Sequence, residues 1–200
     1  MDTKPQEWIY IDAADVAKMV RQDLKKHFAG EKFSVRTDKY SGGASVTIHW
    51  TDGPTGKQVE AIAKKYEGSD FDGMIDLKVS NIHYQNPDGS IDFGGTAGTG
   101  GSGGSIPPQD CCPTYPEAKR VHLGADYIFC TRSVTNEESR LETIARRVWA
   151  TYNTLADKPF SPTWRQERIG NEWMDTFCQR ILTRIDFRVS DEQRINLWET

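Results

Sequence analysis

Residues 33–50 constrain the fold of this chain most strongly, because they carry two short runs of strictly alternating apolar side chains. Apolar residues occupy every second position on either side of a polar turn that contains Gly42 and Gly43: Phe33, Val35, Val46, Ile48 and Trp50. Successive side chains of a strand point to opposite faces of a sheet. The segment therefore predicts a hairpin of two half-buried strands, with an apolar face and a polar face that carries Arg36 and His49.

Helical periodicity flanks this hairpin on both sides. Asp12 is a natural N-cap for a helix whose apolar residues recur at helical spacing until Gly30. Thr55 and Gln58 have the spacing of a capping box, and the helix that they begin is expected to stop at Gly68. The order of elements over 1–68 is therefore helix, strand, strand, helix.

Further strands are expected in the middle of the chain. We expect an acidic turn over 67–73, then a strand over 74–84, a turn at 86–89 and a returning strand near Ile91. Residues 121–134 hold the most apolar short run and predict a strand in the centre of the sheet. Antiparallel extension of one sheet is the simplest arrangement.

The remaining segments are a glycine-rich insertion and helices. Residues 94–105 have few side chains to bury, so they predict a flexible insertion. Thr135 and Glu138 have capping-box spacing before a long amphipathic stripe, a second helix is expected over 171–185, and the tail 191–200 reads as a short helix. We predict an α+β domain over 1–135, with helices packed on one face of an antiparallel sheet, and a helical C-terminal extension over 136–200 on or beside it.

The composition limits the class of protein. No apolar run approaches the roughly 20 residues of a membrane helix, and the N-terminus has no apolar signal segment. The net charge of −4 argues against a general nucleic-acid coat but permits a local basic patch. Positive charge is mostly Lys up to Phe93 and mostly Arg afterwards, which makes the C-terminal half a candidate recognition surface. The plainer explanation, which we favour, is that Arg covers solvated helix faces.

No constellation of residues has the spacing of a catalytic or metal site. Four residues could in principle bind a metal ion, but they lack the two paired ligand motifs, such as Cys-x-x-Cys, that are typical of structural zinc sites: Cys111, Cys112, His122 and Cys130. Free thiols are therefore expected, with Cys130 and Cys178 as small core residues. An acidic group lacks the calcium-loop pattern and reads as a solvated loop: Glu67, Asp70, Asp72 and Asp76. We expect no catalytic residue, no cofactor and no bound metal.

Four ordered motifs resemble one known domain. They are Ala13–Lys25, Phe33–Ser45, Phe71–Met74 and Gly124–Cys130, and together they span roughly residues 10–135. They resemble the large polyvalent protein associated domain of type 29, found in proteins of phages, plasmids and conjugative elements. The resemblance implies a small α+β module that mobile elements deploy against host defences, without assigned catalytic residues. The glycine-rich insertion and the Arg- and Trp-rich C-terminal segment depart from that pattern.

These observations favour a non-enzymatic mobile-element protein in the cytoplasm of a bacterial host. It would bind a host protein or nucleoprotein complex, for example as a counter-defence inhibitor of the anti-CRISPR kind, without a membrane partner. The candidate partner-binding residues are Arg36, Lys39, Tyr40, His49, Arg140, Arg146 and Arg147. One alternative is a nucleic-acid-binding module that adds Lys18, Arg21 and Lys25 to the first four. A second is a small Cys- or metal-dependent enzyme. The sequence does not specify the oligomeric state.

Overall fold

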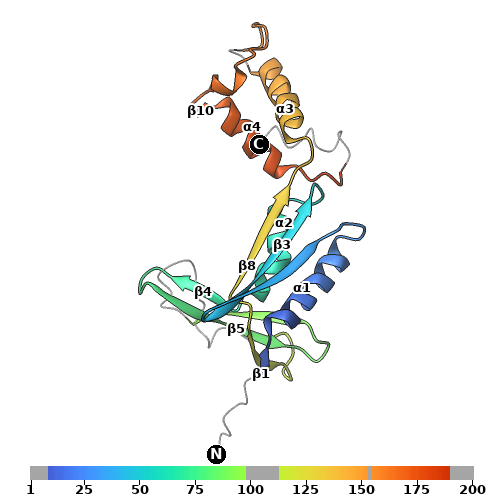
Figure 1. Cartoon of the computed structure of the whole chain (residues 1–200), viewed down its shortest axis with the longest axis vertical. Helices are drawn as coiled ribbons and strands as arrows, with labels where there is room; N and C mark the ends of the chain where they lie inside the picture. Colours follow the sequence, from blue (N-terminus) through green and yellow to red (C-terminus); the bar gives the residue numbers. More distant parts are fainter. Residues whose placement is uncertain (1–8, 98–112, 153–154, 190–200) are drawn as a thin grey trace, which may run out of the picture. The chain divides into compact units, whose positions relative to one another are not determined.

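A computed structural model describes residues 9–97, 113–152 and 155–189. The chain divides into two compact units, which are described separately below. Unit 1 comprises Met1–His49 with Lys57–Thr131, and unit 2 comprises Trp50–Gly56 with Arg132–Thr200. Helices and strands occur in both units (Figure 1), which confirms the α+β class. No helix within the described ranges has the length and apolar character needed to span a membrane.

The predicted first helix and hairpin are confirmed in unit 1. Helix α1 (Ala13–His27) begins after Asp12, whose side chain accepts a hydrogen bond from the Ala14 N–H at 3.3 Å. Strands β2 (Ser34–Tyr40) and β3 (Gly43–Thr51) pair antiparallel, and α1 packs against β2. The turn between them needs Gly42, which has a φ of +90°.

The predicted acidic turn over 67–73 is wrong, because this segment contains a strand. Helix α2 (Gly56–Ala63) continues into a 3₁₀ turn, η1 (Lys64–Tyr66), and β4 (Ser69–Asp72) follows directly. The Gly68 carbonyl accepts a hydrogen bond from the Asn81 N–H at 2.9 Å, which holds the backbone extended beside β5 (Leu77–Gln85). The strand predicted from residue 74 begins only at Leu77, since residues 73–76 form the turn of the β4–β5 hairpin.

The strands of unit 1 do not form one antiparallel sheet. One sheet has the order β1-β7-β5-β4, with β6 (Ile91–Thr96) also paired to β5 as predicted. In it β1 (Ile9–Ile11) pairs in parallel with β7 (Lys119–Leu123). The strand predicted over 121–134 is therefore two strands, β7 and β8 (Tyr127–Ser133). Strand β8 ends a second sheet of order β2-β3-β8 and is not central, because residues 124–126 turn the chain away from β7.

Unit 2 is built around two helices. These are α3 (Glu137–Thr151) and α4 (Met174–Arg184), joined through η3 (Trp164–Gln166) and the short pair β9 (Arg168–Ile169) and β10 (Glu172–Trp173). Both helices contribute to one apolar core that also encloses Trp164. The prediction that Thr135 caps α3 is wrong. The helix follows Asn136, because the Thr135 hydroxyl donates a hydrogen bond to Asp52 instead. The predicted tail helix and most of the glycine-rich insertion lie outside the described residues.

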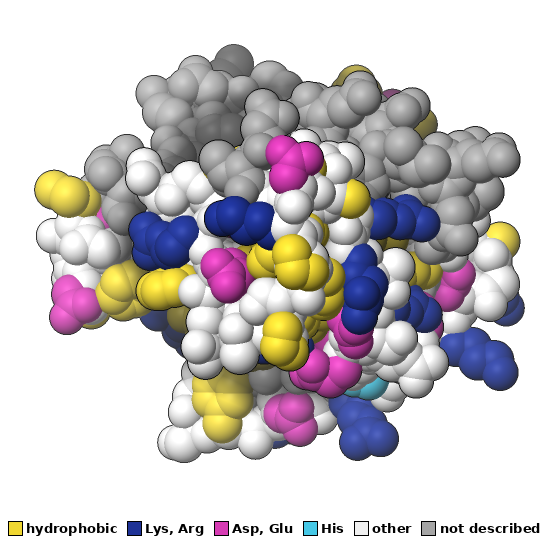
Figure 2. Space-filling model, turned by 90° about the horizontal axis from the view of Figure 1, so that it is seen from above, with side chains coloured by type: hydrophobic (Ala, Val, Ile, Leu, Met, Phe, Trp, Pro, Cys, Tyr) yellow, Lys and Arg dark blue, Asp and Glu magenta, His cyan; other side chains and the backbone are white. Residues whose placement is uncertain are grey.

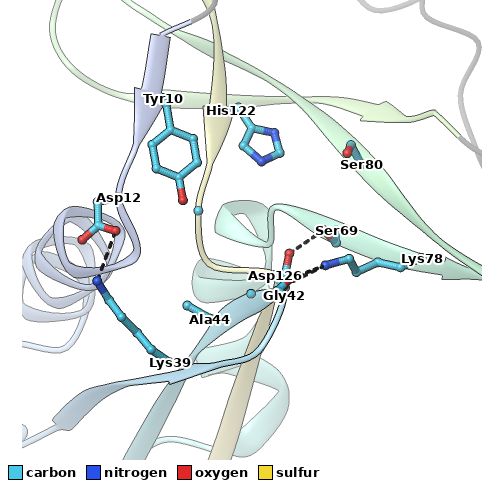
Figure 3. A pocket seen from close by; sticks show the side chains of 12 residues that line it. Tyr10, Asp12, Lys39, Gly42, Ala44, Ser69, Lys78, Ser80, His122 and Asp126 are labelled. Atoms are coloured by element: carbon cyan, nitrogen blue, oxygen red, sulfur yellow. Dashed lines mark hydrogen bonds and ion pairs between the residues drawn. The ribbon is translucent and has the colours of Figure 1, made fainter.

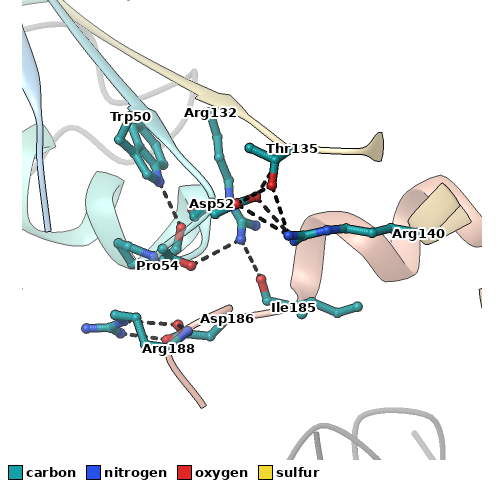
Figure 4. A network of polar contacts seen from close by, with 10 residues as sticks. Trp50, Asp52, Pro54, Arg132, Thr135, Arg140, Ile185, Asp186 and Arg188 are labelled. Carbon is teal, nitrogen blue, oxygen red and sulfur yellow. Dashed lines mark hydrogen bonds and ion pairs between the residues drawn. The ribbon is translucent and has the colours of Figure 1, made fainter. Parts of the chain in front are cut away.

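A polar network closes unit 2 around Asp52 (Figure 4). Its carboxylate accepts hydrogen bonds from the backbone and hydroxyl of Thr135 and pairs with Arg140 Nη1 at 3.2 Å. The Arg132 guanidinium donates to the Asp52, Gly53 and Ile185 carbonyls at 2.8, 3.1 and 2.8 Å. Burial opposes ionisation of Asp52, but the bonds from Thr135 and the nearby arginines outweigh it and lower its pKa.

His83 on β5 makes the stability of the protein depend on pH. The imidazole is 0% exposed and packs edge-on against Phe93 at 5.6 Å, and neither ring nitrogen has a hydrogen-bond partner among the described residues. Burial lowers the pKa of His83 to about 4, the backbone of Lys65 opposes this shift only in part, and the charge of His122 lowers the pKa further. The folded protein therefore carries His83 neutral at neutral pH.

We expect the free energy of unfolding to fall by about 3 kcal/mol as the pH drops from about 6.5 to about 4, because the unfolded chain binds the proton first. Urea titrations at several pH values measure this slope. His83→Leu should flatten it, whereas the exposed control His27→Gln should retain it. An unchanged slope in His83→Leu would contradict the assignment to His83.

Candidate functional site

Unit 1 contains a polar pocket of about 330 Å³ (Figure 3). Seven parts of the chain meet around it: β1, the start of α1, the β2–β3 hairpin, β4, β5, β7 and the connection from β7 to β8. Distant segments of the sequence are thus brought to one place. Asp126, in the β7–β8 connection, lies where most of them meet.

The Asp126 carboxylate is the acceptor that joins these segments. Lys78 Nζ and the Tyr40 hydroxyl both donate to its Oδ2 at 3.0 Å, and the Ser69 hydroxyl donates to its Oδ1 at 2.9 Å. The Asp126 N–H in turn donates to the Ala44 carbonyl at 2.7 Å. With an exposed fraction of only 8%, Asp126 therefore ties β2, β3, β4 and β5 to the start of β8.

The protonation states at this site favour binding over proton transfer. Burial would raise the pKa of Asp126, but hydrogen bonds from Lys78, Ser69 and Tyr40 and the charge of Lys78 outweigh it and lower the pKa. Burial and the bond to Asp126 raise the pKa of Tyr40 to about 12. At neutral pH Asp126 is thus an ionised acceptor with its donors in place, and Tyr40 keeps its proton.

The close packing at this site requires glycine at two positions. A Cβ at Gly43 would lie 1.8 Å from Asp126 Oδ2, and a Cβ at Gly124 would lie 2.3 Å from the Tyr10 hydroxyl oxygen. Real Cβ atoms do not approach so closely, so any larger residue would displace its neighbour. Gly43 was predicted to lie in the turn; in the structure it is the first residue of β3 and lies against Asp126.

The opposite wall of the pocket is aromatic and basic (Figure 3). The rings of Tyr10 and His122, on paired positions of β1 and β7, stack with centroids 5.6 Å apart and an angle of 22°. Lys39 Nζ lies 3.7 Å from Asp12 Oδ1 and is mostly exposed. This side of the pocket thus offers a planar surface and an ammonium group.

The predicted partner-binding residues of unit 1 do not form one surface. Ser34 pairs with His49 and Arg36 with Thr47, so exposed Arg36 and His49 share a face of the hairpin. Lys39 points to the other face, towards Asp12. The Tyr40 hydroxyl is committed to Asp126.

Of the predicted residues in unit 2, two are engaged within the unit. Arg140 pairs with Asp52 and lies over the Phe187 ring at 3.9 Å. Arg146 pairs with Glu142 at 2.6 Å and lies over the Phe160 ring at 4.3 Å. Arg147 is exposed on α3. Arg140 and Arg146 therefore contribute to the packing of unit 2.

Two residues of the basic stripe expected for nucleic-acid binding make contacts within unit 1. Lys18 pairs with Asp15 at 2.7 Å, and the Arg21 guanidinium donates to the Val35 carbonyl at 2.9 Å. In the view of Figure 2, Lys and Arg side chains are interspersed with acidic and apolar ones and do not gather into one patch.

The described cysteines are free and buried or partly buried. Burial raises the pKa of Cys130 to about 11 and that of Cys178 to about 12, so both thiols are protonated at neutral pH. Cys130 was expected in the core, but it lies on β8 and is partly exposed. Cys111 and Cys112 lie outside the described residues. Within the described ranges, no group of three or more His, Cys, Asp or Glu residues is placed to hold a metal ion.

Comparison with known proteins identifies the family. The family model of the large polyvalent protein associated domain 29 matches residues 11–135, which is more than half of the chain. The chain belongs to this family. No curated protein and no solved structure gives a significant match. A member of the large polyvalent protein associated domain 29 family is a phage- or mobile-element-associated protein.

The matched region of the domain 29 family contains the whole Asp126 network. Tyr40, Ser69, Lys78 and Asp126 all lie between residues 11 and 135. The motifs around Gly43 and Gly124, which first suggested the family, meet at this network in space. Two of the four motifs that resemble the family therefore contribute to packing at Asp126.

The domain 29 region also presents an apolar surface that the sequence patterns do not predict. Four large apolar side chains of the β4–β5 hairpin are exposed at 52%, 68%, 45% and 58%, respectively: Phe71, Met74, Ile75 and Leu77. We call these four residues the hairpin tip; Figure 1 shows β4 and β5 side by side on either side of it. Periodicity indicates a strand in this segment but cannot tell whether its apolar face is covered.

Proposed function

We propose that this protein is a non-enzymatic accessory protein of a phage or other mobile element, and that it acts by binding a protein or nucleoprotein complex of its bacterial host. The hairpin tip is the observation that carries this proposal. Complete burial of a large apolar side chain contributes about 1.5–3 kcal/mol. Four such side chains within seven residues therefore offer a compact binding surface.

The backbone of the hairpin tip is fixed by its own contacts. The Met74 N–H donates to the Asp72 carboxylate at 3.0 Å, and the Ile75 N–H donates to the Asp72 carbonyl at 3.3 Å. Asp72 itself is only 4% exposed. A surface held in this way loses little conformational entropy when it binds, which favours affinity.

Charge next to the hairpin tip favours a basic partner. Asp70 and Asp76 are exposed beside the four apolar residues, whereas Lys78 is paired with Asp126. A complementary surface would be an apolar pocket with a basic rim. Basic surfaces are typical of proteins that hold nucleic acids. A defence complex of this kind, such as a CRISPR effector, is therefore the proposed class of target.

A pull-down from bacterial host lysate tests the proposal. The full-length chain carrying Met74→Ser and Leu77→Ser should recover at least tenfold less of its specific partner than the unchanged chain does. Phe129→Ser, which alters a side chain of similar exposure (53%), should retain the partner. All three proteins should unfold at similar temperatures, because exposed substitutions have small effects on stability. Recovery of the same proteins with both variants would contradict the proposal.

A further inference from the structure

The polar pocket retains hydrogen-bonding groups that the residues described by the structure do not use. A Lys ammonium has three N–H donors. Lys78 uses two of them, for Asp126 and for the Gly42 carbonyl at 3.3 Å. Lys39 lies 3.7 Å from Asp12, which is too long for a full hydrogen bond. Donors at two ammonium groups therefore remain available to a ligand.

The acceptors of the pocket, in contrast, are largely occupied. Three donors engage the two carboxylate oxygens of Asp126. Asp12 accepts from the Ala14 N–H and attracts Lys39. A molecule rich in acceptors, above all a phosphate, matches this surplus of donors better than a cation would.

The stacked rings of Tyr10 and His122 add a second requirement. Tyr10 is 63% exposed, and its phenol lies against Gly124, where no side chain intervenes. Among the residues that the structure describes, neither the Tyr10 hydroxyl nor the Ser80 hydroxyl is used in a hydrogen bond. An exposed aromatic face beside polar groups is the kind of surface on which a nucleobase stacks.

From this combination we propose that the pocket of Tyr10, Lys39, Lys78 and His122 binds a nucleoside monophosphate, either free or as the 5′ end of a nucleic-acid strand. The phosphate contacts the Lys39 ammonium group and the base stacks on the Tyr10 ring, while Lys78 offers its remaining donor from the Asp126 side of the pocket. The volume of about 330 Å³ lies at the lower end of the range for small-molecule sites, which suits one nucleotide. This site does not depend on the proposed protein partner.

Titration of the full-length chain with AMP, followed by amide chemical shifts in NMR, tests the site. We expect saturable changes at pocket residues with a Kd tighter than about 1 mM. Lys39→Gln and Tyr10→Ser should each weaken AMP binding by about tenfold. Lys18→Gln, at a lysine of similar exposure outside the pocket, should leave binding unchanged. Thermal unfolding confirms that each variant is folded.

Two further probes separate the possible sources of the ligand. A 5′-phosphorylated trinucleotide that binds more tightly than AMP would assign the pocket to the end of a strand, and equal or weaker binding would assign it to the free nucleotide. Either result supports the site. The proposal would be overturned if AMP binding does not saturate, or if Lys18→Gln and Lys39→Gln weaken AMP binding equally. It would also be overturned if inorganic phosphate binds as tightly as AMP.

Discussion

Replacing Gly68 with alanine should destabilise the protein by about 3 kcal/mol, because the new methyl group has no space. A Cβ at this position would lie 2.0 Å from the Leu123 carbonyl oxygen and 3.0 Å from that of Ala125. Both neighbours are backbone atoms, so no change of side-chain rotamer relieves the clash. Moving them would also break the hydrogen bond of 2.7 Å from the Gly68 N–H to the Ala125 carbonyl. Urea unfolding of the full chain measures the effect.

Gly56→Ala is the matched control for this prediction. A Cβ at Gly56 would meet no atom within 4 Å, and the residue begins α2. Alanine is favoured over glycine in a helix, so this variant should be as stable as the unchanged protein or slightly more so. Equal stability of Gly68→Ala and Gly56→Ala would show that β4 does not approach the β7–β8 connection as described.

The second large effect is expected at Asp126. In Asp126→Ala the Lys78 ammonium and the Tyr40 and Ser69 hydroxyls lose their common acceptor. Removing one partner of a buried charged network costs about 3–5 kcal/mol, and we expect the lower end because Lys78 is partly exposed. The exposed carboxylate of Asp15, which pairs with Lys18, is the control; Asp15→Ala should cost less than about 1 kcal/mol.

The pH dependence of this variant separates the charge of Asp126 from simple loss of packing. The pKa of Asp126 is lowered in the folded protein, so its contribution is present above the ordinary carboxyl value of 3.8. The contribution is lost as the pH falls through the folded value. The stability deficit of Asp126→Ala should therefore shrink below about pH 4. A deficit that stays constant in acid would contradict the role of the ionised carboxylate.

Local patterns in the sequence predict the elements that depend on neighbouring residues. Asp12 indicates the start of α1, and the alternation around Gly42 predicts β2 and β3. They do not predict β4, because Ser69–Asp72 is rich in turn-forming residues and becomes a strand only through contacts with β5 and the β7–β8 connection. The cap of α3 was misassigned for the same reason, since Thr135 bonds to Asp52, which lies far away in the sequence.

The candidate sites were harder to predict than the fold. Tyr40 and Asp126 are separated by 86 positions in the chain, so no spacing rule links them. Tyr40 and Lys39 were identified as candidates for their type and exposure, but their contacts emerge only in the folded chain. The hairpin tip has a sequence signal, namely four large apolar residues around an Asp-Gly turn. That signal is ambiguous, because the same residues in a covered strand would form a core.

Photocrosslinking from residue 74 tests the central claim, protein binding through the hairpin tip, most directly. A photoreactive amino acid replaces Met74 in the full chain, which is expressed in the bacterial host; a second chain carries it at Phe129, where the native side chain is similarly exposed. We predict that the group at position 74 forms an adduct with one host protein and that the group at position 129 does not. No adduct at position 74, or the same adducts at both positions, would contradict the claim.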